Sequence, residues 1–167
     1  MGIGDIAVVD AGPVIHLFEI GALDLLAGWR QLLMPEAVWE ETVAVRRVTA
    51  QAIDDLDNVH VVGVDKKEIM KFVRVFRLEN LQRGEVEGLF LCKTKHVSLF
   101  FTDDFAAREA AKRLGIQPVG SLGIIVKAYH LGRLSRSEAE NRLRSLHRVS
   151  SLFVTYELIE FAIRQLT

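Results

Sequence analysis

The sequence predicts an α/β protein in which a mostly parallel sheet is covered by helices on both faces. Short apolar runs of strand length alternate with segments whose apolar residues recur at helical spacing, over most of the 167 residues. Half of the residues are hydrophobic, which is enough for a sizeable core in one domain. Buried strands that alternate with helices are typical of parallel sheets, because the crossover helices cover the faces.

The first half of the chain contains three predicted strands. Ile6–Val9 is a short apolar run of the kind found in buried strands, and the helical pattern that follows it breaks at Gly21. Leu32–Met34 is a second apolar run, which ends at Pro35 because proline suits the first turn of the next helix. Val59–Val64 is rich in valine, a β-branched residue that favours a third strand.

The second half continues the alternation and ends in helices. Val97–Phe101 and Gln117–Val119 are the fourth and fifth predicted strands. We expect an α/β unit over residues 1–134 and a helical extension of the same domain over residues 135–167. The predicted helices of this half and of the segment before it are Lys66–Leu81, Gly84–Cys92, Ala106–Leu114, Ile124–Leu131, Ser135–Leu146 and Tyr156–Leu166.

Composition and charge argue against a strongly basic, an internally disulfide-linked and a membrane-spanning protein. The 21 Lys and Arg residues nearly balance the 22 Asp and Glu residues, so no global basic field indicates nucleic-acid binding, although a local basic face is compatible with this balance. Cys92 is the only cysteine, which fits a small buried hydrophobe in a reducing compartment. No apolar stretch approaches the roughly 20 residues of a membrane span, and we therefore expect a cytoplasmic protein.

Acidic residues follow the predicted strands, at the edge where open parallel sheets bind ligands. Asp10 follows the first strand, and Asp103 and Asp104 follow the fourth. If these two strands are neighbours, four or five carboxylates from distant parts of the chain meet in one cleft. The further acidic residues, near predicted helix starts, are Glu40, Glu41, Glu85 and Glu87.

Carboxylates gathered in one cleft repel one another unless they share protons or hold a cation. Mg²⁺ or Mn²⁺ is the natural cation for oxygen ligands, since the five histidines are scattered without the spacing of zinc ligands. Such an ion lowers the pKa of a bound water and neutralises charge on phosphate oxygens. The reaction class that follows is phosphodiester hydrolysis without a protein nucleophile.

Five motifs occur along the chain in this order: Asp10-Ala-Gly-Pro-Val-Ile-His-Leu, Met34-Pro-Glu-Ala-Val-Trp-Glu-Glu, Arg83-Gly-Glu-Val-Glu-Gly-Leu, Thr102-Asp-Asp-Phe-Ala-Ala-Arg-Glu-Ala-Ala and Gly120-Ser-Leu-Gly-Ile-Ile. Together they resemble the motifs of the PIN-domain nucleases. The similarity spans about Ile6 to Arg133, and the most similar branch has a Gly-Glu and an Asp-Asp-x-x-Ala-Arg motif and is related to VapC-type toxin ribonucleases. The resemblance implies a three-layer α/β/α fold, an acidic cleft that binds Mg²⁺ or Mn²⁺, and cleavage of single-stranded or structured RNA.

The resemblance also implies roles for individual acidic residues. By position, Asp10 matches the first acid of the family and Glu41 the second, and the fourth falls on Asp103 or Asp104, which spacing does not separate. The implied catalytic residues are Asp10, Glu41, Glu85, Asp103 and Asp104, and the implied metal ligands are Asp10, Glu85, Asp103 and Asp104.

The third acid and the residue after Ala11 depart from the family pattern. The third acid is Glu85 or Glu87, of which we prefer Glu85 because it follows the helix-opening glycine, whereas the wider family more often has Asp. Gly12 stands where many relatives have Ser or Thr, whose hydroxyl supports the carboxylate of Asp10. The alternative function is therefore a degenerate PIN-like domain that binds RNA or a protein partner without cleavage.

Several of these residues also have a purely structural interpretation. Asp104 and Ser121 are suited to cap the helices that follow them, and Arg108 is spaced to pair with Asp104 along a helix. Acidic residues near helix starts favour the positive end of the helix dipole, and Glu41 and Glu85 fit that interpretation as well.

Two kinds of protein partner are compatible with the end of the chain. Its predicted helices carry apolar stripes that exceed what a small sheet needs for cover, which indicates a homodimer or a groove for an antitoxin protein. The family resemblance implies both partners. The stripes contain Leu143, Leu146, Leu158, Ile159, Ala162, Ile163 and Leu166.

Overall fold

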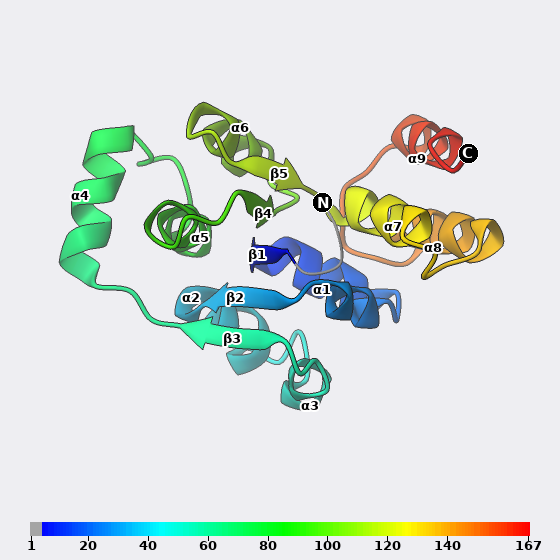
Figure 1. Ribbon diagram of the computed structural model, residues 1–167, viewed down its shortest axis with the longest axis horizontal. Helices are drawn as coiled ribbons and strands as arrows, with labels where there is room; N and C mark the ends of the chain where they lie inside the picture. Colours follow the sequence, from blue (N-terminus) through cyan, green and yellow to red (C-terminus); the bar gives the residue numbers. More distant parts are fainter. Residues whose placement is uncertain (1–4) are drawn as a thin grey trace.

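A five-stranded parallel sheet lies between two layers of helices in the computed structural model, which describes residues 5–167 (Figure 1). The strand order is β3-β2-β1-β4-β5, so the first strand is central and the first and fourth strands are neighbours. This confirms the predicted three-layer α/β/α fold. The strands are β1 (Ile6–Val9), β2 (Gln31–Pro35), β3 (Val59–Val62), β4 (Leu99–Phe101) and β5 (Gln117–Val119).

Alternate side chains of the central strands enter two separate hydrophobic cores, as expected for a sheet covered on both faces. In β1, Ala7 and Val9 lie in the larger core and Val8 lies in the smaller one. The larger core also contains buried residues of α1 (Ala11–Glu19), the 3₁₀ turn η1 (Leu23–Gly28), α7 (Ser121–His130), α8 (Arg136–Arg148) and α9 (Tyr156–Arg164). The smaller core lies under α4 (Lys66–Phe76), α5 (Arg83–Thr94) and α6 (Phe105–Arg113).

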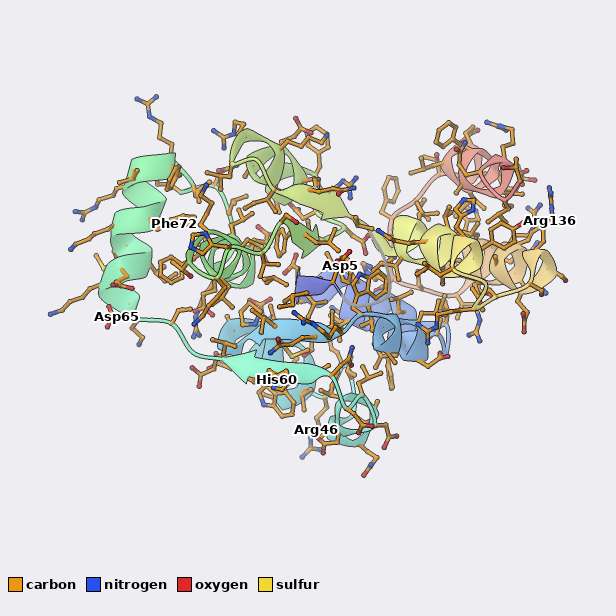
Figure 2. The ribbon with its side chains drawn as sticks, viewed as in Figure 1. Asp5, Arg46, His60, Asp65, Phe72 and Arg136 are labelled. Atoms are coloured by element: carbon orange, nitrogen blue, oxygen red, sulfur yellow. The ribbon has the colours of Figure 1, made fainter. Side chains whose placement is uncertain are left out.

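Aromatic contacts hold the outermost helix, α4, to the smaller core. Phe72 points from α4 toward α5 (Figure 2), and its ring meets that of Phe90 edge to face with the centroids 5.5 Å apart. The helix is shorter than the predicted Lys66–Leu81, because Arg77 adopts a left-handed backbone conformation that ends it.

Other segments also differ from the sequence prediction, and the fourth strand begins at Leu99 instead of Val97. The third strand ends at Val62 instead of Val64 and is an edge strand, with His60 and Val61 exposed. The sequence analysis missed the short helix α3 (Ala50–Asp54), which Thr49 caps by accepting a hydrogen bond from the amide of Ala52 at 3.2 Å.

The helix predicted after the second strand consists of α2 (Glu36–Trp39) and a π-helical turn, η2 (Glu40–Ala44). Pro35 is the last residue of β2 and the N-cap of α2, one position before the predicted first turn. The hydroxyl of Thr42 donates to the carbonyl of Val38 at 2.7 Å within this bent segment. The widened turn carries Glu40 and Glu41 past the carboxyl edge of the sheet.

The last two helices belong to the protein's own larger core. Most of the predicted apolar stripe is buried there, including Leu143, Leu146 and Ile159, whereas Leu158 and Phe161 stay about half exposed. Most of the stripe is therefore not free for a partner. The prediction that it exceeds what the sheet needs for cover is wrong in this respect, because the stripe covers the larger core. No helix of residues 5–167 combines the length and the apolar character needed to cross a membrane. The first four residues of the predicted 1–134 unit lie outside the described residues.

Candidate active site

A cleft of about 610 Å³ opens at the carboxyl edge of β1 and β4. Because the two strands are paired, the amide of Asp10 donates to the carbonyl of Phe101 at 2.9 Å, and the residues after both strands lie side by side. The cleft brings together all the acidic residues implied as catalytic from the sequence, which are Asp10, Glu41, Glu85, Asp103 and Asp104.

Asp10 is the most buried of these acids, with 5% of its surface exposed. Its Oδ1 accepts from the amide of Ala11 at 2.8 Å, and its Oδ2 accepts from the hydroxyl of Thr102 at 2.7 Å. Burial raises the pKa of Asp10 to about 6, although both hydrogen bonds favour the ionised form. The hydroxyl that the family pattern places at position 12 is thus supplied to Asp10 by Thr102.

Asp103 and Asp104 have different environments, which their adjacency in sequence hides. Asp104 caps α6, since its Oδ1 accepts from the amide of Ala107 at 2.8 Å, as the structural interpretation expects. The carboxylate of Asp103 accepts from the amide and the hydroxyl of Ser121 at 2.7 and 2.6 Å, and Nδ1 of His16 lies 2.7 Å from its Oδ2. Asp103, which follows β4, therefore contacts residues of α1 and α7, whereas Asp104 caps the start of α6.

His16 and Ser121 are site residues whose part the sequence did not reveal. Ser121 is the first residue of α7 and not its cap, because Gly120 holds the cap position; the predicted capping role is wrong. A Cβ at Gly120 would lie 2.7 Å from Oδ1 of Asp103, so only glycine allows this approach. The sequence held one signal for His16. It lies four residues after Gly12 in α1, so it shares a helix face with a residue that lies beside Asp103.

Glu85 and Glu87 point in different directions from α5. Glu85 lines the cleft, and its Oε2 accepts from the amide of Gln82 at 2.9 Å in a capping box. Burial raises the pKa of Glu85 to about 7, and the nearby charge of Asp10 adds to this shift. Glu87 instead accepts from the amide of Ala37 at 3.1 Å and from Nε of Arg83 at 2.9 Å. Geometry therefore favours Glu85 as the candidate third acid.

Glu41 connects the π-helical turn to the start of α5. Its Oε1 accepts from the amide of Gly84 at 3.3 Å, and a Cβ at that glycine would lie 2.9 Å from Oε2. Burial raises the pKa of Glu41, and the charge of Glu87 adds to the effect. The neighbouring Glu40 instead accepts from Arg83 at 2.6 Å at the surface, so the two adjacent acids again have different surroundings.

Cations are few around these acids. Arg108 donates to the carbonyl of Thr102 at 3.2 Å, and within the described part of the chain it forms no ion pair with Asp104, so the predicted helical pair is absent. Arg47 lies on the rim, 3.6 Å from Oε1 of Glu19. Asp10 and Glu85 therefore face other carboxylates more than they face cations, which is the electrostatic arrangement that a bound cation would relieve.

The donor set suits a hard divalent ion, because every one of the five acids offers carboxylate oxygens. Each of them also accepts at least one hydrogen bond from the protein. In this conformation, no three His, Cys, Asp or Glu side chains within residues 5–167 are gathered tightly enough to hold a metal ion. Ion binding would require some of these carboxylates to turn toward a shared point.

The fold and the cleft together define an α/β/α protein with acids at the carboxyl ends of paired parallel strands. The chain belongs to the PIN-domain family, since the family model described as DUF3368, PIN domain, matches residues 6–167. PIN domains are in general nucleases and usually use divalent metal ions. A comparison with curated proteins finds no match.

Proposed function

We propose that this protein is a metal-dependent endoribonuclease that hydrolyses RNA phosphodiester bonds in the acidic cleft. The observation that carries the proposal is the meeting of five carboxylates from four separate segments in one cleft. Structural needs explain Asp104 as the cap of α6 and Glu87 as an acceptor for Ala37. Asp10 likewise caps α1, but a helix cap does not require a carboxylate buried beside other acids.

In the proposed mechanism, four acids would bind the metal ion and three neighbouring residues hold two of these acids in place. Asp10, Glu85, Asp103 and Asp104 would hold Mg²⁺ or Mn²⁺, which when bound activates water and neutralises charge on the phosphate. Thr102 fixes the carboxylate of Asp10, and Ser121 with His16 fixes that of Asp103.

Glu41 is the candidate proton acceptor. Its Oε1 is held by the amide of Gly84, which leaves Oε2 for a proton from the attacking water. Its raised pKa brings the group nearer to the operating pH, which is where a general base is most effective.

A role as the toxin of a toxin-antitoxin pair extends this proposal. It is supported by the similarity of the five motifs to VapC-type toxin ribonucleases. On this extension the protein acts in the cytoplasm, forms a homodimer and is inhibited by an antitoxin protein. Growth arrest on expression in a bacterium, lost in Asp10→Asn, is the expected result; undiminished growth with active enzyme would contradict the extension.

The test is cleavage of a panel of labelled RNAs by the purified protein with Mg²⁺, with Mn²⁺ and with a chelator. We expect cleavage that needs the metal and disappears in Asp10→Asn. Glu40→Gln is the matched control, because Glu40 is an exposed acid beside the cleft and does not line it. If no RNA is cut, or if Asp10→Asn cuts equally well, the nuclease proposal is wrong for those RNAs and the non-cleaving alternative gains support.

A further inference from the structure

The segment between α8 and α9 exposes one aromatic side chain almost completely. Phe153 is 95% exposed, whereas Leu152 packs against the larger core and Val154 is buried in it. Because both neighbours pack on the core, Phe153 is left on the outer side of the segment. Phe153 has therefore lost almost none of its apolar surface to folding.

The backbone on both sides of Phe153 is held by specific contacts. The amide of Ser151 donates to Oε2 of Glu19 at 2.6 Å, and its hydroxyl accepts from Arg47 at 3.2 Å. On the other side, the carbonyl of Val154 lies 2.9 Å from Nδ1 of His147. The exposure of Phe153 is therefore built into a tethered segment.

Phe153 lies where the acidic cleft meets a second, mainly apolar groove of about 680 Å³ between α7 and α9. Figure 1 shows the segment, in orange, passing beside the first turn of α7. Phe153 and Leu152 line both hollows, and so does Asp103. If the phosphate of a bound ligand lies among the carboxylates, the part of the ligand next to that phosphate lies beside the Phe153 ring.

Positively charged side chains line both hollows that Phe153 joins. Arg47 lines the cleft, and Arg108 and Lys127 line the groove. An apolar surface bordered by cations and joined to the candidate catalytic cleft has the chemistry of a site for nucleotides, whose bases stack and whose phosphates are anionic. An apolar protein segment would gain nothing from these cations.

We infer that Phe153 stacks on an unpaired base adjacent to the cleaved phosphate and so positions the RNA strand in the cleft. The inference rests on the proposed function and adds a residue that positions the substrate. A paired base keeps its faces covered by its neighbours in the helix, and only a base outside a helix offers a face to the ring.

The test compares Phe153→Ala with Phe153→Trp, which keeps an aromatic surface. Because the side chain is exposed, neither change removes core packing. Phe105→Ala is the control, since Phe105 is an exposed phenylalanine that lines neither hollow. Phe161→Ala reports on the groove, which Phe161 lines. The substrates are an unstructured labelled RNA strand and the same strand annealed to its complement. Binding is measured in the Asp10→Asn background, which keeps the RNA intact.

We expect Phe153→Ala to raise KM and the Kd for the single strand by about tenfold, within the range for loss of one base–aromatic stack, and to leave kcat nearly unchanged. Phe153→Trp and Phe105→Ala should bind and cut like the wild type. The duplex should be cut poorly by every variant.

The outcomes separate this inference from the proposed function. If the wild type cuts RNA and Phe153→Ala has the same KM and Kd, the inference is wrong and the nuclease stands. If the wild type cuts nothing, the nuclease proposal fails; a tenfold loss of binding then still supports the role of Phe153, and equal or absent binding refutes it. If Phe153→Ala and Phe161→Ala weaken self-association and leave RNA binding unchanged, the groove binds a second copy and the inference is wrong.

Discussion

Replacing Asp10 with asparagine should stabilise the metal-free protein at neutral and alkaline pH while it abolishes activity. Burial raises the pKa of Asp10 from 3.8 to about 6. The folded state therefore binds this proton more tightly than the unfolded state does. Stability falls as the pH rises from about 4 to about 6, and the full penalty persists at higher pH.

The size of the effect follows from the shift and from the hydrogen bonds. A shift of about two pKa units corresponds to about 3 kcal/mol of destabilisation by the ionised group. Asparagine removes the charge but offers one acceptor oxygen in place of two, for the amide of Ala11 and the hydroxyl of Thr102. Losing one such bond costs about 1 to 2 kcal/mol, so we expect Asp10→Asn to raise the unfolding free energy by about 1 to 2 kcal/mol at pH 8.

The assay is urea unfolding in the presence of a chelator at pH 8 and at pH 4.5. At pH 4.5 the folded wild type carries a proton on Asp10, so the gain should vanish or reverse. The exposed Asp24→Asn should change stability by less than about 0.5 kcal/mol at either pH. Adding Mg²⁺ should stabilise the wild type more than the variant. An Asp10→Asn protein that is no more stable than the wild type at pH 8 would refute this account of the cleft.

Three further substitutions test how the site is held. Thr102→Val removes the hydroxyl that lowers the pKa of Asp10, so the acid limb of the pH–rate profile should move to higher pH and unfolding should cost about 1 to 3 kcal/mol less; an unmoved limb would contradict the assignment. Glu85→Gln should abolish cleavage and keep the fold, whereas Glu87→Gln should lose about 1 to 2 kcal/mol in urea unfolding and keep cleavage; the reverse result would exchange their roles. Gly12→Ser should change stability by less than about 1 kcal/mol and preserve cleavage, because a Cβ there would be 3.4 Å from its nearest neighbour; lost cleavage in a folded protein would count against this expectation.

The sequence predicted the central strand Ile6–Val9 with its observed bounds, because burial on both faces makes it a continuous apolar run. Gln117–Val119, at one edge of the sheet, also has the predicted bounds. The edge strand was drawn too long, since Val64 continues the β-branched pattern beyond the last paired residue, Val62. Helix α3 was missed because five residues are too few to show a helical period.

The acidic cleft could be predicted because parallel strands place their carboxyl ends at one edge, and Asp10 lies next to the residues that follow β4. Two positions apart on a helix differ in direction by about 200°, so only the structure could separate Glu85 from Glu87. The contacts of Thr102 and His16 join segments far apart in the chain, and no local pattern encodes them. The ion, the RNA, the antitoxin, the homodimer and the division at residue 134 stay predictions.

The tether between Ser151 and Glu19 makes the end of the chain part of the cleft. Ser151, Leu152 and Phe153 form its rim, and Arg47 donates a hydrogen bond to the hydroxyl of Ser151. A protein shortened at residue 134 would lose that rim and would uncover the apolar surface of α7. Screening for activity therefore requires the full chain, and an inactive truncated protein would carry no information about the acids.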